Sequence, residues 1–315
     1  MASEDTHTAP AIEAGKIWFD GALVPQAEAK VSVLTHAMHY GTSVFEGIRA
    51  YETESGAAVF RLEEHVQRLL DSAKILGMRT GVPSFDEIVH AVTETVRANG
   101  RTSCYIRPLL WYGSESLGVS PARNRVHFMV ATWSWGTYLG EDAVAQGAQL
   151  MTSSWRRSPA DVMPTKSKAG GNYVNSVLAN QEARDNGFDE ALLLDTSGFV
   201  AEGSGENLFL VREDVLYPVA HSVNLRGITR DSVVRLAEAQ GIEVRETWAT
   251  RDELYTADEV FMVGTAAEVT PIAAIDRRPI GDGTAGPFAM QMRRWYLDAV
   301  TGKDARFESW LTYVA

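Results

Sequence analysis

The chain has 315 residues, which is enough for one large domain or for two smaller domains with their own cores. Its 45% hydrophobic content fits a soluble globular protein, and its net charge of −12 argues against a nucleic-acid partner, because phosphate backbones are bound through surplus Lys and Arg. The single cysteine, Cys104, excludes an intramolecular disulfide and fits a reducing cytoplasm. We expect no metal, since the seven histidines lack metal-ligand spacing, and no membrane helix, since no apolar run approaches about 20 residues.

The first part of the chain predicts a hairpin and two amphipathic helices. Residues 16–25 read as two short strands joined by an Asp-Gly turn. Apolar residues recur at helical spacing through 61–78 and again through 84–100. The second helix is predicted to begin at Ser84 or Asp86, because carboxylates occupy its first turn.

Two strands with candidate binding residues are predicted next, at 102–113 and 126–136. Pro108 lies inside the first of them and indicates an edge strand or a bulge, because proline lacks the N–H that a sheet interior uses. Tyr105 and Arg107 are two residues apart, so the strand places them on one face, where they could grip a carboxylate.

The chain is predicted to have an α+β (mixed α/β) fold in two domains. Residues 1–14 lack the pattern of a signal peptide and are expected to be a disordered tail. A small N-terminal α/β domain is predicted at 15–135. Residues 136–147 lose apolar alternation and are glycine-rich, so we expect the domain connection there, followed by a larger domain at 148–315.

The stretch 164–209 contains the residues with the clearest chemistry. Lys168 precedes a glycine pair, Asn172 is placed to cap a helix that ends at Gly187, and a hairpin then delivers Glu202. A lysine nucleophile condenses with a carbonyl, and a pyridoxal ring needs a carboxylate to keep its nitrogen protonated. A single Lys or Glu is far more often an ordinary solvated residue, so the prediction depends on the whole pattern.

Several segments together resemble the fold-type IV pyridoxal-phosphate aminotransferases of the branched-chain amino acid family. They are HYGTSVFEGIRAY, YIRP, KAGGNY and AEGSGENLF, and the similarity runs from about Ile17 to the last residues. The resemblance implies a larger domain with a β-barrel-like core, and an active site between the domains and near the interface of a homodimer. It leaves a further assembly of dimers open, such as a hexamer.

The resemblance also assigns residues to the cofactor, pyridoxal 5′-phosphate. Lys168 would carry it as an imine and move the substrate Cα proton, Glu202 would face the ring nitrogen, and Tyr173 would bind the 3′ oxygen. The residues implied for the phosphate are Arg68, Ile228, Thr229 and Thr265. Thr229 is in addition a plausible N-cap, and the N–H groups at a helix start bind phosphate readily.

A second set of residues is implied for the substrates. The α-carboxylate would lie on Tyr105, Thr265 and Ala266, and Arg107 is our candidate for the second carboxylate of 2-oxoglutarate, because its fork binds carboxylates in a bidentate manner. The side-chain pocket is implied to consist of Phe45, Gly47, Tyr173 and Trp135, with Tyr40 and Val119 contributed by the partner subunit.

The sequence therefore predicts a cytoplasmic transaminase of branched-chain amino acid biosynthesis that acts on Leu, Ile or Val with 2-oxoglutarate. D-amino-acid transaminases, (R)-amine transaminases and aminodeoxychorismate lyase share the lysine and the glutamate and are the alternatives. Lys166 lies two residues before Lys168, so strand parity does not separate them, and the glycine pair favours Lys168. Arg226, beside the predicted phosphate-binding turn, leaves the pocket shape and the preferred substrate open.

Overall fold

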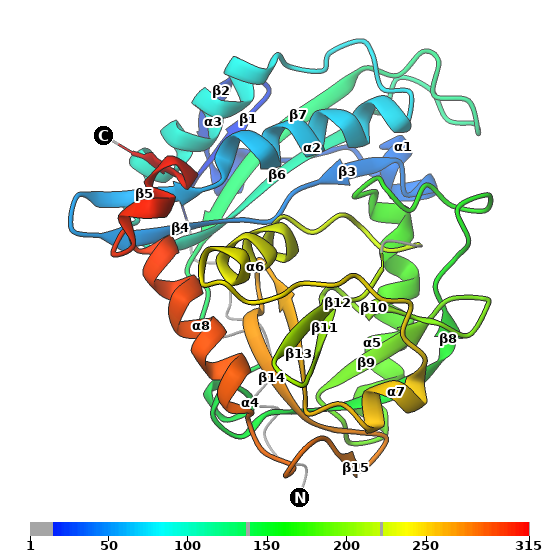
Figure 1. Cartoon of the computed structure of the whole chain (residues 1–315). Coiled ribbons are helices and arrows are strands. Elements are labelled where there is room, and N and C mark those ends of the chain that lie inside the picture. The colour runs from blue at the N-terminus through cyan, green and yellow to red at the C-terminus, as the bar shows by residue number, and fades with distance from the viewer. Residues whose placement is uncertain (1–14, 137–138, 221–222, 315) are drawn as a thin grey trace, which may run out of the picture. The chain divides into compact units, whose positions relative to one another are not determined.

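The computed structural model describes residues 15–136, 139–220 and 223–314 and confirms the mixed α/β class (Figure 1). The predicted tail at 1–14 lies outside the described residues. Contacts divide the described chain into two units. We call them the N-terminal unit (15–135, 167–173 and 299–314) and the C-terminal unit (136, 139–166, 174–220 and 223–298). The functional domain boundaries named above stay a prediction.

The N-terminal unit is built on an antiparallel sheet. Its strands follow the order β16-β5-β4-β6-β7-β1-β2, and β3 pairs with β6. The predicted first hairpin is confirmed, with both residues of its Asp-Gly turn at positive φ. The strands are β1 Lys16–Phe19, β2 Ala22–Pro25, β3 Ser43–Phe45, β4 Ile48–Thr53, β5 Gly56–Phe60, β6 Cys104–Tyr112, β7 Val126–Trp133 and β16 Leu311–Tyr313.

Two long helices share one core with this sheet. Helix α3 begins directly after Ser84, whose hydroxyl accepts the N–H of Glu87 while the Glu87 carboxylate accepts the N–H of Ser84, so the start predicted at Ser84 is confirmed. Leu69 and Ile88 are fully buried in the core, each contributing roughly 1.5–3 kcal/mol. The helices of this unit are η1 Gln26–Glu28, α1 His36–Tyr40, α2 Leu62–Ile75, α3 Phe85–Ala98, η2 Gly170–Asn172 and η3 Ala305–Trp310.

Pro108 lies in the interior of the sheet, so the predicted edge position is wrong. On one side β6 pairs with β7 along its length; on the other it pairs first with β4 and then with β3. Pro108 falls at the break between β3 and β4, where its carbonyl accepts the N–H of Glu46 at 2.9 Å. The missing N–H of proline therefore removes no bond from either neighbouring strand.

The C-terminal unit contains a mixed sheet in the order β10-β9-β8-β14-β13-β11-β12, with β15 on β14. Strand β8 runs parallel to β9 and β14, and the other pairs are antiparallel. Its core includes Leu150, Leu192 and Met262. The strands are β8 Ala148–Arg156, β9 Glu190–Leu194, β10 Val200–Gly203, β11 Asn207–Arg212, β12 Val215–Pro218, β13 Glu259–Gly264, β14 Glu268–Ile275 and β15 Arg278–Pro279.

Five helices complete the described chain, and two of them run from one unit into the other. Tyr173 at the start of α5 belongs to the N-terminal unit, as do the last two residues of α8. Among the described residues, no helix has the length and hydropathy needed to cross a membrane. The helices are α4 Glu141–Gln146, α5 Tyr173–Asp185, α6 Ile228–Ala239, α7 Arg251–Tyr255 and α8 Pro287–Val300.

Candidate active site

Lys168 lies on a backbone segment that is tied to α2 and β3. Its N–H donates to the hydroxyl of Ser72 at 3.0 Å, and its carbonyl accepts the N–H of Phe45 at 3.1 Å. The glycine pair that follows serves this packing, since a Cβ on Gly170 would lie 2.4 Å from Oγ of Ser43. The chain itself approaches the glycines closely, because residues 41–43 pass directly against this turn.

The amine of Lys168 is half-buried among aromatic groups. Nζ donates to the hydroxyl of Tyr173 at 2.8 Å and lies 5.2 Å from the ring centre of Phe45. The rings of Phe45 and Tyr173 are themselves in contact, with centroids 4.8 Å apart. A lysine held on a tyrosine hydroxyl with restricted solvent is suited to nucleophilic and acid–base chemistry.

Lys166 has different partners and lies in the other unit. Its Nζ donates to the carbonyl of Asn224 at 2.8 Å. Burial, and then the nearby charge of Arg226, lower the pKa of Lys166, although Glu202 acts in the opposite direction. Strand parity does not separate the two lysines. The contact of Lys168 with Tyr173 favours Lys168 as the reactive one.

Arg68 is held by a buried carboxylate that sequence reasoning had not singled out. Glu46 is fully buried and binds Arg68 through both oxygens, at 2.7 and 2.8 Å, while His65 Nδ1 donates to it at 2.7 Å. Burial opposes ionisation of Glu46, but the charge of Arg68 and the two hydrogen-bonding partners outweigh it and hold the pKa of this carboxyl well below its usual range. Burial also lowers the pKa of His65, so the imidazole is a neutral donor at pH 7.

Arg107 lies in an aromatic environment close to Tyr105, which confirms that the two share one face of β6. Nη2 donates to the Tyr105 hydroxyl at 3.1 Å, and the guanidinium carbon lies 4.6 Å from the ring centre of Phe45 and 5.7 Å from that of Trp133. The Nε atom is buried and has no hydrogen-bond partner. A half-buried guanidinium with an unused donor has the chemistry to bind an anion.

Further aromatic residues surround Tyr105. Trp135 stacks on its ring at 4.9 Å, and Trp133 contacts it at 5.0 Å. Gly47 is required here, since a Cβ at that position would lie 1.9 Å from the Tyr105 hydroxyl. Sequence reasoning missed Trp133, although its alternation with Trp135 at the end of a strand was the available signal.

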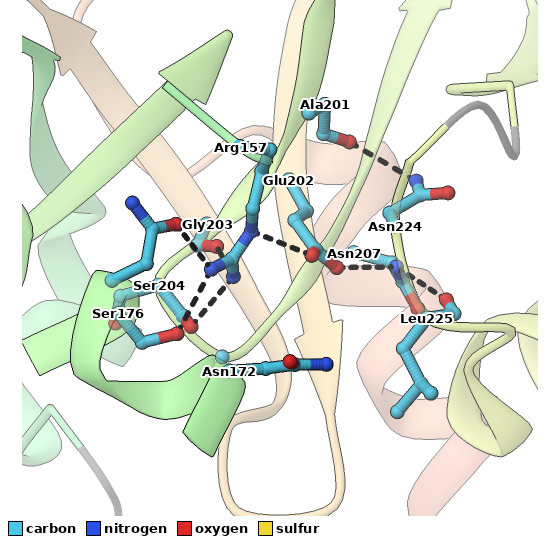
Figure 2. A network of polar contacts seen from close by, with 12 residues as sticks. Arg157, Asn172, Ser176, Ala201, Glu202, Gly203, Ser204, Asn207, Asn224 and Leu225 are labelled. Carbon is cyan, nitrogen blue, oxygen red and sulfur yellow. Dashed lines mark hydrogen bonds and ion pairs between the residues drawn. The ribbon is translucent and has the colours of Figure 1, made fainter. Parts of the chain in front are cut away.

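Glu202 lies at the centre of a buried polar network in the C-terminal unit (Figure 2). The pairing of β10 with β9 shifts register between Val200 and Glu202. The carboxylate of Glu202 forms an ion pair of 2.8 Å with Nε of Arg157. Nδ2 of Asn207 lies 3.5 Å from the other carboxylate oxygen and also donates to the carbonyl of Leu225. Arg157 was not predicted, because no local pattern distinguishes it from its neighbour Arg156.

The comparisons with known proteins decide the family. Residues 43–275 match the family described as Amino-transferase class IV. The chain belongs to the class IV aminotransferases. It is 48% identical over 301 residues to the branched-chain-amino-acid aminotransferase of Pseudomonas aeruginosa, a match that covers 95% of this chain and 97% of that protein.

Solved structures of a branched-chain amino acid aminotransferase from the organism abbreviated T.th. are similar over 96% of this chain and 100% of theirs. The structure with pyridoxamine 5′-phosphate has a TM-score of 0.94 and 63% identity. The complex with N-(5′-phosphopyridoxyl)-L-glutamate has a TM-score of 0.93 and 61% identity.

Class IV aminotransferases use pyridoxal phosphate, and the residues of this chain fit that cofactor. The N-terminal unit contains the amine of Lys168, and the C-terminal unit contains the buried carboxylate of Glu202, both of them groups of the kind that this cofactor needs. Helix α6 begins after Gly227, and the start of a helix is a place where backbone N–H groups bind phosphate readily. The predicted N-cap at Thr229 is wrong, because the N-cap is Gly227, two residues earlier, and Thr229 lies within the first turn of the helix.

The remaining predicted residues lie in a turn and on an exposed surface. Thr265 and Ala266 are half-buried in the turn between β13 and β14. Tyr40 and Val119 are 46% and 85% exposed, and His36 Nε2 lies 2.8 Å from the Gly118 carbonyl, which brings their two segments together. We call the exposed large hydrophobic residues of this region the apolar surface: Val31, Val33, Leu34, Met38, Tyr40, Leu117 and Val119.

No group of three or more His, Cys, Asp or Glu residues that could hold a metal ion occurs within 15–136, 139–220 and 223–314.

Proposed function

We propose that this protein is a pyridoxal-phosphate-dependent transaminase that moves the amino group between the branched-chain L-amino acids Leu, Ile and Val and 2-oxoglutarate. The observation that carries the proposal is the presence, in one unit, of a half-buried lysine amine on a tyrosine hydroxyl and of an arginine with an unused buried donor. The first suits amino-group chemistry, and the second suits the extra carboxylate of 2-oxoglutarate.

The proton transfers are assigned to Lys168. When bound, pyridoxal phosphate supplies an electron sink for the charge that develops at the substrate Cα as its proton leaves. The amine of Lys168 takes that proton as a base and returns it as an acid, and the hydroxyl of Tyr173, 2.8 Å away, holds the amine in place. Glu202 is assigned to the ring nitrogen, where its negative charge favours the protonated form.

The remaining residues are assigned to binding. Arg68, oriented by Glu46, would hold the phosphate together with Ile228, Thr229 and Thr265. The substrate α-carboxylate is assigned to Tyr105, Thr265 and Ala266, and the apolar side chain to Phe45, Gly47, Tyr173 and Trp135. These groups combine charged donors for the two anionic ends with aromatic surface for the substrate side chain.

Arg107 is assigned to the second carboxylate of 2-oxoglutarate and glutamate. Leucine has no such group, so the same position must also accept an apolar side chain. The rings of Phe45, Tyr105 and Trp133 around the guanidinium support both states, because aromatic faces stabilise a cation that has no anion beside it. The complex of the T.th. enzyme with phosphopyridoxyl-L-glutamate supports glutamate as one of the two substrates.

We also propose that a second copy of the chain covers the apolar surface and places its Tyr40 and Val119 at the substrate pocket of the first. An exposed apolar surface of seven large residues is typical of a protein interface. Dimers that assemble further into a hexamer are compatible with this proposal. A cytoplasmic location is proposed as well, since the free thiol of Cys104 is buried and unpaired by any disulfide.

The test of the proposed function is to reduce the cofactor-loaded protein with borohydride and to map the modified peptide. The modified residue is expected to be Lys168, and Lys168→Ala should abolish labelling and turnover, whereas Lys166→Ala should keep both. L-leucine with 2-oxoglutarate is expected to be consumed far faster than D-alanine or (R)-phenylethylamine. Labelling at Lys166, or preference for the D-amino acid, would contradict the proposal.

A further inference from the structure

Arg157 is bound from every side by groups of the C-terminal unit (Figure 2). Its Nη1 donates to Asn175 Oδ1 and to Ser176 Oγ, each at 3.0 Å. Its Nη2 donates to the backbone carbonyls of Gly203 and Ser204 at 3.1 and 2.9 Å. Nε lies 2.8 Å from the Glu202 carboxylate as an ion pair, without hydrogen-bond geometry, so four hydrogen bonds and this ion pair orient the guanidinium.

These contacts connect two elements, β8 and α5, to the backbone that carries Glu202. Arg157 follows β8, Asn175 and Ser176 lie near the start of α5, and Gly203 and Ser204 directly follow Glu202 at the end of β10. The guanidinium therefore fixes both the carboxylate of Glu202 and the chain immediately after it. A side chain with this many fixed contacts holds its partner's position closely.

A second buried carboxylate, Glu206, interacts with this guanidinium, and Glu206 in turn interacts with Glu190. Burial, then the neighbouring Glu190, raise the pKa of Glu206 to about 8, so this carboxyl is mostly neutral at pH 7. Burial also raises the pKa of Glu190, whose oxygens accept the N–H of Ala191 and the amide of Asn180. The positive charge of Arg157 is thus left to Glu202.

We propose that Arg157 is the positioning residue for the cofactor's ring nitrogen, because it holds Glu202 as an oriented anion in a buried environment. This inference rests on the proposed function, in which Glu202 faces that nitrogen. Without the guanidinium, a buried carboxylate takes up a proton and becomes neutral. Glu202 would then no longer keep the ring nitrogen protonated, although Lys168 could still bind the cofactor.

The test compares Arg157→Met and Arg157→Lys with the wild type, each loaded either with pyridoxal phosphate or with 1-deazapyridoxal phosphate, which has no ring nitrogen. With the natural cofactor, the rate of the half-reaction with L-leucine is expected to fall about 10- to 100-fold. This is the range seen in metalloenzymes when a residue that hydrogen-bonds to a metal ligand is removed, and Arg157 holds Glu202 in a comparable way. With the deaza cofactor, the variants and the wild type should react at equal rates. The double variant with Glu202→Gln should be no slower than Glu202→Gln alone.

Arg156→Met is the matched control, since this exposed neighbour donates to the Ser153 carbonyl and lies outside the network. It should react like the wild type with both cofactors. A pH titration of the bound cofactor's absorbance gives a readout separate from activity, and it should shift in Arg157→Met but not in the control. Arg157→Lys keeps the charge, and it decides the question if Arg157→Met does not fold.

Equal losses with both cofactors would show that Arg157 only supports the fold, and this result would overturn the inference. An unchanged rate with the natural cofactor would overturn it too. Borohydride mapping of each variant separates this inference from the proposed function. Labelling of Lys168 in the wild type and in Arg157→Lys keeps the proposed function intact even when the deaza comparison fails.

Discussion

Replacing Arg107 by leucine should separate the two substrates of the enzyme. Leucine fills much of the same volume, so the variant removes mainly the guanidinium. In glutamate turnover this removes a charge-assisted pair between the fork of Arg107 and the second carboxylate, for which the buried Nε has an unused donor. Hydrogen bonds to charged groups contribute about 1.5–3 kcal/mol. The expected loss of kcat/KM for glutamate is therefore roughly 10- to 150-fold, at about 1.4 kcal/mol per factor of ten.

The leucine reaction should lose much less. For this substrate Arg107 contributes only its bond to the Tyr105 hydroxyl and its contacts with aromatic rings. Loss of one such hydrogen bond is worth about 1 kcal/mol, or roughly fivefold. The kcat/KM of Arg107→Lys for glutamate should lie between those of the wild type and Arg107→Leu, because lysine keeps the charge but lacks the fork.

The assay is single-turnover kinetics of each half-reaction, with L-glutamate and L-leucine as separate amino donors. This design avoids mixing the two substrates in one rate. Thermal denaturation of the variant checks that the fold is retained. If both amino acids lose the same factor, Arg107 does not bind the second carboxylate, and the assignment is wrong.

Three further predictions follow from the packing and the buried charges. Gly47→Ala should lower kcat/KM for both amino acids about equally. The new Cβ would lie 1.9 Å from the Tyr105 hydroxyl and would displace it, and a loss confined to glutamate would contradict this. Glu46→Gln should lower the free energy of unfolding in urea by about 3–5 kcal/mol, because Arg68 keeps a largely buried charge without its carboxylate, and a change below 1 kcal/mol would count against the pair. Finally, Glu206 has a folded-state pKa of about 8 against 4.5, so its protonation stabilises the fold fully below pH 4.5 and this contribution is lost as pH rises toward 8. In Glu206→Gln, the free energy of unfolding should fall less steeply as the pH rises from 5 to 8. Denaturant titrations at each pH measure this, and an unchanged dependence on pH would contradict the assignment.

Local features of the fold were predictable because their signals lie within a few residues. The helix start at Ser84 was predicted from the carboxylates of its first turn, and Ser84 and Glu87 form a capping box there. The Asp-Gly turn of the first hairpin is another such case. The start of α6 was misplaced by two residues, since Gly227 caps the helix without a side chain and leaves no sequence signal of the usual kind.

Features that depend on distant parts of the chain were not predictable. Arg157 acquires its role from acceptors that lie up to 47 residues away, at Ser204, and nothing in its own neighbourhood indicates them. Glu46 pairs with Arg68 across 22 residues, from the break between two strands to the middle of a helix. Strand β16, near the end of the chain, pairs with β5 in its first part, and a three-residue strand is too short to show alternation.

The buried charges of this chain differ in a way that matches their proposed roles. Arg157 has the Glu202 carboxylate beside it, so its charge is compensated before any ligand arrives, which fits a residue proposed to position Glu202. Arg107 has aromatic rings and a tyrosine hydroxyl, and no carboxylate of the described chain pairs with it. A cation without a counter-charge gains most from an anionic ligand, while its aromatic surroundings keep the site acceptable to an apolar one. One pocket can thus accept glutamate and leucine in turn, as a transaminase that alternates between them requires.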